Sequence, residues 1–301
     1  MLRIGLFMAT NIAILALFTI IFQGLGLEQY LASQGINANL TGMLIMCAMF
    51  GFGGSFVSLL ISKWMAKRSS GTQIIEQPST PEERWLMETV ADLAKKADIG
   101  MPEVGIFPAQ QSNAFATGWN KNNALVAVSA GLLHRFDKEE VRAVLAHEIG
   151  HVANGDMITL TLIQGVLNTF VMFFARILGS IIDKAVFKND RGHGIGYFVI
   201  VMVLQVVLGI FASMIVMAFS RWREFRADNA GAQLASRGAM IAALQKLQAE
   251  TNIQAQAQAP NQMPDTLTAF GISSGWKQHA SRLFMSHPPL EERIETLRRG
   301  L

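Results

Sequence analysis

The chain has 301 residues, of which 51% are hydrophobic and only 16% are charged. Soluble domains average about 25% charged residues, so this composition excludes a disordered chain and argues against a single water-soluble globule. The net charge of +3 is too small to indicate nucleic-acid binding. A single cysteine, Cys47, excludes a disulfide framework. We therefore expect a protein of the lipid bilayer with no nucleic-acid partner.

Long segments with almost no charge predict membrane helices, because about 20 consecutive apolar residues span a bilayer. The segments are residues 4–25, 40–61, 157–174 and 197–219. The first has an apolar run too long for a cleaved signal peptide, so we interpret it as an uncleaved anchor. The third is the weakest, because Gln164 and Asn168 lie within it and Arg176 lies near its end. A buried helix of a soluble domain remains the alternative for the third and fourth.

The distribution of basic residues predicts the orientation. Lys63, Lys67 and Arg68 follow the second segment, whereas the short loop 29–39 has no lysine or arginine. Cytoplasmic flanks carry more basic residues, so the N-terminus and the chain after residue 62 are predicted to be cytoplasmic. The loop between the third and fourth segments contains three basic residues, Lys184, Lys188 and Arg191, which oppose its transfer across the membrane. The sequence therefore leaves open whether these two segments span the membrane.

The predicted division of the chain is 1–62, 63–156, 157–219 and 220–301, with two membrane parts and two polar parts alternating. In the first polar part, Thr80 and Glu83 form a capping-box pattern that predicts a helix to about Ala97. Strand-like segments at 104–107, 112–117 and 124–129 predict a small sheet, which we expect to be antiparallel. A second capping pattern, Asp137 with Glu140, begins another helix.

The second polar part is predicted to be mostly helical. Helices are expected from residue 222 to 235, from there to 249, and at 286–300. Between them, residues 251–278 are rich in Gln, Ala, Asn, Pro and Ser without periodicity, which predicts a loop of unassigned role.

The motif that indicates a catalytic metal site is His147-Glu148-Ile149-Gly150-His151, on the second predicted helix. Residues four apart share one face of a helix, so both imidazoles can bind one metal ion. Glu148 is adjacent to the first ligand, where it can accept a proton from the attacking water. A surface helix with two ordinary histidines is the alternative. The helix period and cap agree with the motif.

Catalytic zinc needs a third protein ligand. The extended motif of one zinc-protease group would place histidine at position 157, where this chain has Met157. Glu224 and Asp228 lie four apart, just after the fourth apolar segment. Two crossings return the chain to the same membrane face, so one of these carboxylates can bind the metal while the other orients a ligand. An ion pair of Glu224 with Arg221 or Arg223 is the alternative.

The ordered set of motifs resembles the HtpX family of membrane-bound zinc metalloproteases, relatives of the CaaX prenyl protease and of a mitochondrial inner-membrane stress protease. The resemblance covers nearly the whole chain. Its motifs are two N-terminal spans, residues 113–118, 147–151 and 154–156, two further apolar segments, 224–228, and 286–293.

The resemblance implies a role for each matching residue. His147, His151 and Glu224 would bind one Zn²⁺ per chain, and Glu148 would be the general base. Asp228 and Arg293 would lie around the ligands, and His287 would donate a hydrogen bond to the oxyanion. An edge strand would bind extended substrate through Asn113, Ala114, Phe115 and Ala116. The alternatives are that His287 only begins a helix and that Arg293 only pairs with Glu140 or Asp156.

The implied fold is α+β and mostly helical: a zincin-like metalloprotease domain with a small sheet, formed by 63–156 and 220–301 and attached to four membrane helices. The implied activity is a zinc endopeptidase in the bacterial inner membrane that cleaves misfolded membrane proteins or unfolded polypeptides at the cytoplasmic face. Quality control and stress response come from the resemblance alone. The alternatives are a CaaX-type processing protease and a non-catalytic zinc-containing scaffold. The sequence does not identify the substrates, the cleavage sites, the oligomeric state or the mechanism that restrains the activity.

Overall fold

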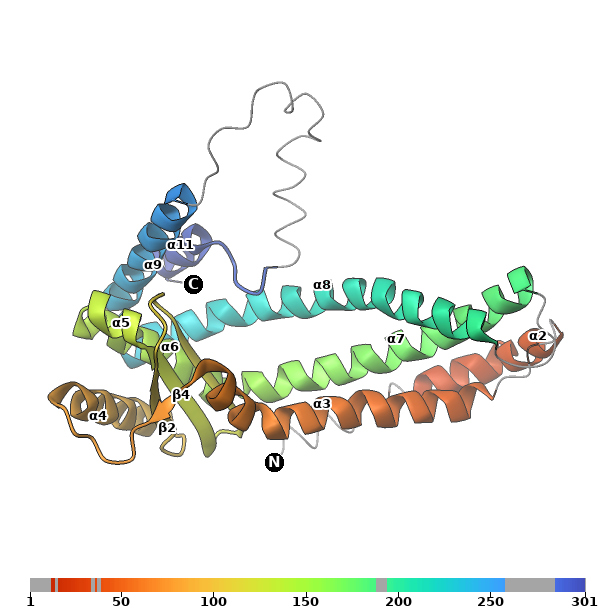
Figure 1. Ribbon diagram of the computed structural model, residues 1–301, viewed down its shortest axis with the longest axis horizontal. Helices are drawn as coiled ribbons and strands as arrows, with labels where there is room; N and C mark the ends of the chain where they lie inside the picture. The colour runs from red at the N-terminus through yellow and green to blue at the C-terminus, as the bar shows by residue number, and fades with distance from the viewer. Residues whose placement is uncertain are drawn as a thin grey trace, which may run out of the picture. The chain divides into compact units, whose positions relative to one another are not determined.

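The computed structural model describes residues 12–13, 16–33, 36, 39–187, 194–257 and 285–300, and these are mostly helical with one four-stranded sheet (Figure 1). The chain forms two compact units. One comprises Met1–Ser58 with Leu160–Val216, and the other comprises Leu59–Thr159 with Met217–Leu301.

Three helices among the described residues are long and apolar enough to cross a membrane: α3 (Leu40–Ser70), α7 (Asp156–Phe187) and α8 (Ile195–Leu234). They contain the second, third and fourth predicted apolar segments. Of the first predicted segment, residues 12–13 and 16–24 are helical, whereas residues 4–11 and 14–15 lie outside the described residues. The short helix α2 (Leu27–Ser33) lies partly where a loop was predicted, and the Glu28 carboxylate accepts a hydrogen bond from the backbone N–H of Leu40.

In the first unit, α3 and α7 pack closely through small residues. A Cβ added at Gly51 would lie 2.5 Å from Thr169 Oγ1 and 2.9 Å from the carbonyl oxygen of Gly165. Only glycine permits this approach, since real Cβ atoms almost never come so near another atom. Elsewhere in the unit, an apolar cluster includes Leu44 and Phe173, both almost completely buried.

The second unit holds the sheet, in the order β1-β2-β4-β3. The strands are β1 (Gln73–Ile74), β2 (Glu103–Phe107), β3 (Ala114–Asn120) and β4 (Asn123–Ser129). The prediction of an antiparallel sheet is wrong for one pair, because β4 runs parallel to β2 while the other pairs are antiparallel. The residues of β4 from Ala124 to Ser129 are all buried, and such a continuously apolar strand is stable at the centre of a sheet.

Helices α4 (Pro81–Lys96), α5 (Ala130–Arg135), α6 (Lys138–Asn154), α9 (Arg237–Ala257) and α11 (Leu290–Arg299) complete this unit. Both predicted capping boxes are confirmed, one at Thr80 with Glu83 and the other at Asp137 with Glu140. The predicted ends of two other helices are wrong. Helix α9 continues to Ala257, so the predicted loop 251–278 is helical in its first residues and otherwise lies outside the described residues. Helix α11 begins only after Pro289.

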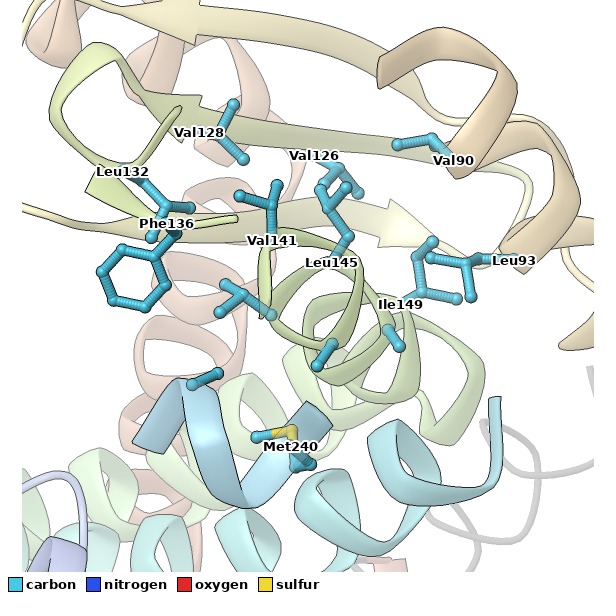
Figure 2. Packing of buried hydrophobic residues seen from close by; sticks show 14 of the residues in the cluster. Val90, Leu93, Val126, Val128, Leu132, Phe136, Val141, Leu145, Ile149 and Met240 are labelled. Carbon is cyan, nitrogen blue, oxygen red and sulfur yellow. The ribbon is translucent and has the colours of Figure 1, made fainter. Parts of the chain in front are cut away.

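Helix α6 packs between the sheet and α9 in the core of this unit (Figure 2). Val141, Leu145 and Ile149 of α6 are almost completely buried, and Val126 of β4 and Met240 of α9 belong to the same cluster. The helix that carries both histidines is therefore fixed on both sides by the core.

Candidate metal centre and active site

His147 and His151 lie on the last turns of α6, which ends at Gly155. Gly155 has φ 68°, a left-handed conformation that glycine adopts without strain and that commonly ends helices. The chain then turns directly into α7, whose first residue is Asp156. Nδ1 of His151 donates a hydrogen bond of 2.7 Å to Oδ2 of Asp156.

Small residues let α8 approach α6 at this point. A Cβ added at Gly150 would lie 2.8 Å from the Cβ of Ala230, and one added at Gly231 would lie 3.3 Å from the backbone nitrogen of His147. The two helices therefore meet at backbone distance, which places Glu224 of α8 beside both histidines.

The predicted metal ligands come together. Oε1 of Glu224 lies 3.2 Å from Nε2 of His151, and Oε2 lies 3.5 Å from Nε2 of His147. One ligand atom from each residue lies within 4.8 Å of the others. Glu224 is only 2% exposed, and it lies within ion-pair distance of the three histidines of the site and of Arg293.

These three side chains fit a catalytic zinc ion. Oε2 of Glu224 is buried and lies 2.7 Å from Nδ1 of His287, with Nε2 of His147 and Nη1 of Arg293 at 3.5 Å. Without a metal ion these basic groups surround the carboxylate, and a divalent cation bound by the same ligands would compensate its charge instead. Two imidazoles and one carboxylate are the ligand set of zinc hydrolases, which leaves one coordination position open.

A second layer of carboxylates orients the histidines. Nδ1 of His147 lies 2.9 Å from Oδ1 of Asp228, one turn after Glu224 on α8. Asp156 contacts Nδ1 of His151 in the same way, so each imidazole has a carboxylate at Nδ1. The Nε2 atom of each ring then faces Glu224. This arrangement fixes the tautomer and makes the free nitrogen a better ligand. The contribution of Asp156 was not predicted. Its position directly after the Asn154-Gly155 helix stop was the available signal.

Arg293 is buried and binds Asp228 with two hydrogen bonds, of 2.7 Å from Nε and 2.5 Å from Nη2. The alternative pairing of Arg293 with Glu140 or Asp156 is wrong. Glu140 accepts instead from Lys246 at 2.8 Å, and Asp156 accepts from His151. The arginine therefore compensates the charge of the carboxylate that orients His147.

The charges of the site shift its pKa values in opposite directions. Burial alone would lower the pKa of His151, but the hydrogen bonds to Asp156 and Glu224 outweigh it and raise the pKa to about 9. Burial alone would raise the pKa of Glu224, but the imidazoles of His147 and His151 hold it far below its usual range. The metal-free site is therefore a proton-holding cluster of imidazolium and carboxylate, and a metal ion must displace those protons.

A cavity of about 490 Å³ lies beside the ligands. His147, Glu148, His287 and Arg293 contribute to its lining, and so does an apolar set comprising Leu132, Val144, Met240, Ala243, Leu244, Leu247 and Leu290. The cavity thus joins the metal centre to a largely apolar wall, which suits an apolar side chain of a polypeptide.

The predicted substrate strand lies partly at this cavity. Asn113 and Ala114 line it. Phe115 packs against Phe107, with ring centroids 5.4 Å apart, and Ala116 packs on the apolar core. Residues of a strand alternate between its faces, so Ala114 and Ala116 pack on the core while Phe115 lies on the opposite face of β3.

His287 lines the cavity with a side chain that is 60% exposed, and its Nδ1 lies 2.7 Å from Oε2 of Glu224. The structure therefore brings His287 to the metal centre, as predicted, with a metal ligand as its nearest charged group.

The comparisons with known proteins agree with this geometry. The family model of peptidase family M48 matches residues 80–300. The protease HtpX of Hahella chejuensis (strain KCTC 2396) is 65% identical over 297 residues, and that of Ectopseudomonas mendocina (strain ymp) is 64% identical over 299 residues, each match covering 99% of both chains. The crystal structure of Ste24p from S. mikatae has a similar fold, with a TM-score of 0.59 and 18% identity over 93% of this chain and 66% of that chain.

The family, the zinc-type ligand set and the three membrane-length helices all describe one kind of protein. The chain belongs to peptidase family M48, and it is a multi-pass membrane zinc metalloprotease whose zinc site is His147, His151 and Glu224.

Proposed function

We propose that this protease cleaves unfolded or damaged membrane proteins at the cytoplasmic face of the bacterial inner membrane, in protein quality control under stress. The observation that carries the proposal is the cavity in which Glu148 and a zinc ligand share a lining with an apolar wall and the start of edge strand β3. An edge strand binds the backbone of an extended chain, so selectivity for sequence should be broad. Broad selectivity is what quality control requires.

Zinc, when bound, supplies a Lewis acid that polarises the scissile carbonyl and makes water more acidic. In this proposal Glu148 accepts a proton from the attacking water and later delivers it to the amide nitrogen as the C–N bond breaks. Glu148 fits this role because it follows His147 directly and lines the cavity.

His287 is proposed to stabilise the tetrahedral oxyanion. Its Nδ1 lies 2.7 Å from Oε2 of Glu224 and its ring lines the cavity, so a ring N–H is available beside the place where the oxyanion would form. Asp228 and Arg293 are proposed to hold His147 in place without contacting substrate, since Asp228 is buried against Arg293 and the His147 ring.

The side of the membrane is proposed from charge. Lys63, Lys67 and Arg68 follow the apolar part of α3 and belong to the unit that holds the zinc site. Basic residues accumulate on the cytoplasmic side, so this unit is proposed to be cytoplasmic.

Membrane vesicles of defined orientation test the proposal. Inside-out inner-membrane vesicles with wild-type enzyme should cleave an unfolded model membrane protein added from outside, whereas vesicles with Glu148→Gln should not. Right-side-out vesicles should show no cleavage until they are permeabilised. A prenylated peptide serves as the comparison substrate. Cleavage of the prenylated peptide alone would replace the proposal with the processing reaction, and cleavage in intact right-side-out vesicles would overturn the proposed side.

A further inference from the structure

A cavity of about 320 Å³ lies between the membrane-length helices of the first unit, and the proposed reaction does not use it. Helices α3, α7 and α8 all contribute to its lining. We call it the polar notch, and define it by Ser55, Ser58, Gln164, Asn168 and Val216. Gln164 and Asn168 are the residues that make the third apolar segment unusual.

The notch holds several polar side chains in apolar surroundings. Phe56 and Val57, next to Ser55 on α3, are each 56% exposed, and Ile215 on α8 is 55% exposed. Exposed apolar side chains on membrane-length helices are expected to face lipid, so the hydrogen-bonding groups of the notch would lie beside the hydrocarbon. A polar group there is costly when it has no partner, and such residues mark functional positions more often than ordinary ones do.

Hydrogen bonds within the notch leave capacity unused. Nε2 of Gln164 donates to Oδ1 of Asn168 at 2.8 Å, which occupies one donor and one acceptor of the two amides. The carbonyl of Gln164 and the amino group of Asn168 remain as an acceptor and a donor on two residues that line the same cavity. Oγ of Ser55 is buried, with the residue 8% exposed, and has no hydrogen-bond partner among the described residues.

Neighbouring polar groups show that this arrangement is not a general property of these helices. The Thr169 hydroxyl, beside Asn168, donates to the carbonyl of Gly165 on its own helix at 2.8 Å. The hydroxyl of Ser62, two turns after Ser55, likewise donates to the carbonyl of Leu59 at 2.7 Å. Ser55 makes no such bond, although the same helical geometry is available to it. Among the described residues, the notch therefore combines an unpartnered hydroxyl with two amides that use only part of their hydrogen-bonding capacity.

The chemistry of the lining selects the class of ligand. No residue that lines the notch is charged, so a lipid phosphate or a metal cation would lack a counter-charge there. Donors and acceptors occur together, which matches a group that both donates and accepts. Hydroxyl and carboxamide side chains are such groups.

We propose that the polar notch binds an uncharged polar side chain (Ser, Thr, Asn or Gln) on a transmembrane segment of the substrate. The inference rests on the proposed function and extends it to substrate choice. In a correctly assembled membrane protein such side chains bond to neighbouring helices. In a damaged or unassembled one they face lipid, so a site for them distinguishes damaged from intact substrates.

Matched substrates in proteoliposomes test the inference. Two model membrane proteins share an unstructured flank with a cleavage site and differ only by Asn or Leu at the centre of one transmembrane segment. Wild type should cleave the Asn substrate about fivefold faster, the effect of a single hydrogen bond in a membrane. Gln164→Leu/Asn168→Leu should remove the preference. Equal cleavage of both substrates by wild type, or an unchanged preference in the double variant, would overturn the inference.

Cross-linking gives a second readout that does not require cleavage. Ser58→Cys lines the notch, and Val57→Cys provides a neighbouring position on α3 that does not line it. Both are made in the Glu148→Gln background, and a short bismaleimide links them to a cysteine one turn from the Asn of the substrate. Cross-linking should occur through residue 58 and only with the Asn substrate. Equal cross-linking through residue 57, or with the Leu substrate, would contradict a specific site.

Casein separates the two proposals. If wild type cleaves casein and cleaves both membrane substrates equally, the proposed protease function stands and the proposed role of the notch is contradicted. Wild type that cleaves none of the three would fail as the proposed protease, while the cross-link would still report binding in the notch. Thermal unfolding and casein cleavage by Gln164→Leu/Asn168→Leu show whether that variant folds, and Asn168→Gln, which retains an amide, should keep part of the preference.

Discussion

Nδ1 of His151 donates a 2.7 Å hydrogen bond to Oδ2 of Asp156, the residue that begins α7. Helix α6 ends only one residue earlier, at the left-handed Gly155. The junction of two helices therefore supplies the carboxylate that orients a zinc ligand, and the chain needs no separate loop for that purpose.

Asp156→Asn should weaken zinc binding by about 10- to 100-fold, because removal of the carboxylate partner of a metal-bound histidine has effects of this size. Asparagine keeps the size of the side chain, so the fold should be retained. Competition with a chromophoric chelator measures the affinity. Asp98→Asn is the control, since the Asp98 side chain is 99% exposed and pairs with Lys121. An affinity equal to that of the control would show that Asp156 does not support the site.

Glu224→Ala should abolish stoichiometric zinc binding, because it removes one of three protein ligands. Glu148→Gln should retain one zinc per chain, since Glu148 is not among the three grouped ligands. Metal analysis of detergent-purified protein distinguishes the two. Full zinc content in Glu224→Ala would move the third ligand to another residue, with Asp228 the nearest carboxylate on the same helix face.

Arg293→Met should destabilise the second unit by about 3–5 kcal/mol, because Asp228 would remain buried without its partner. Arg293→Met/Asp228→Leu should recover most of that free energy of unfolding, since an apolar pair can replace a buried ion pair. Zinc affinity should stay low in the double variant, because Asp228 also faces Nδ1 of His147. Arg299→Ala, at an exposed pair with Glu295, should change the free energy of unfolding by less than about 1 kcal/mol.

The double variant separates stability from metal binding. Recovery of zinc affinity together with stability would mean that Asp228 serves only to neutralise Arg293. Failure to recover stability would mean that the ion pair contributes through something other than charge compensation.

Zinc binding should release protons at neutral pH. In the metal-free site the pKa of His151 is raised to about 9, so the imidazole is protonated at pH 7 and zinc must displace that proton. Apparent affinity should therefore fall as pH falls below about 9, by about tenfold per pH unit for each proton released. Calorimetric titration in buffers with different ionisation enthalpies counts the protons. Asp156→Asn should release fewer, and an enthalpy independent of buffer in wild type would contradict the raised pKa.

The sequence predicts the parts of the site that depend on local geometry. His147 and His151 follow from helical spacing. The return of the chain to one membrane face makes Glu224 and Asp228 the candidates for the third ligand, and the family resemblance selects Glu224. Asp156 was missed because its contact depends on a left-handed turn at Gly155, which sequence indicates as a helix end without giving the direction of the next helix. The contact of Arg293 with Asp228 was not predicted either, since it depends on how α11 packs, which no local pattern encodes.

The fold was predicted unevenly for similar reasons. Capping boxes are local, and those at Thr80 and Asp137 are confirmed. The parallel pairing of β2 with β4 is not local, because it depends on which strand the core places at the centre. Helix α9 was predicted too short, since its last turns contain glutamine and alanine with no apolar period to distinguish helix from loop.

The measurement that tests the central claim most directly is zinc content and casein cleavage on detergent-purified protein, with wild type beside Glu148→Gln. The account predicts one zinc per chain in both proteins and cleavage by wild type alone. Cleavage by Glu148→Gln at the wild-type rate would contradict the role of Glu148, and absence of zinc from both would contradict the His147, His151 and Glu224 site.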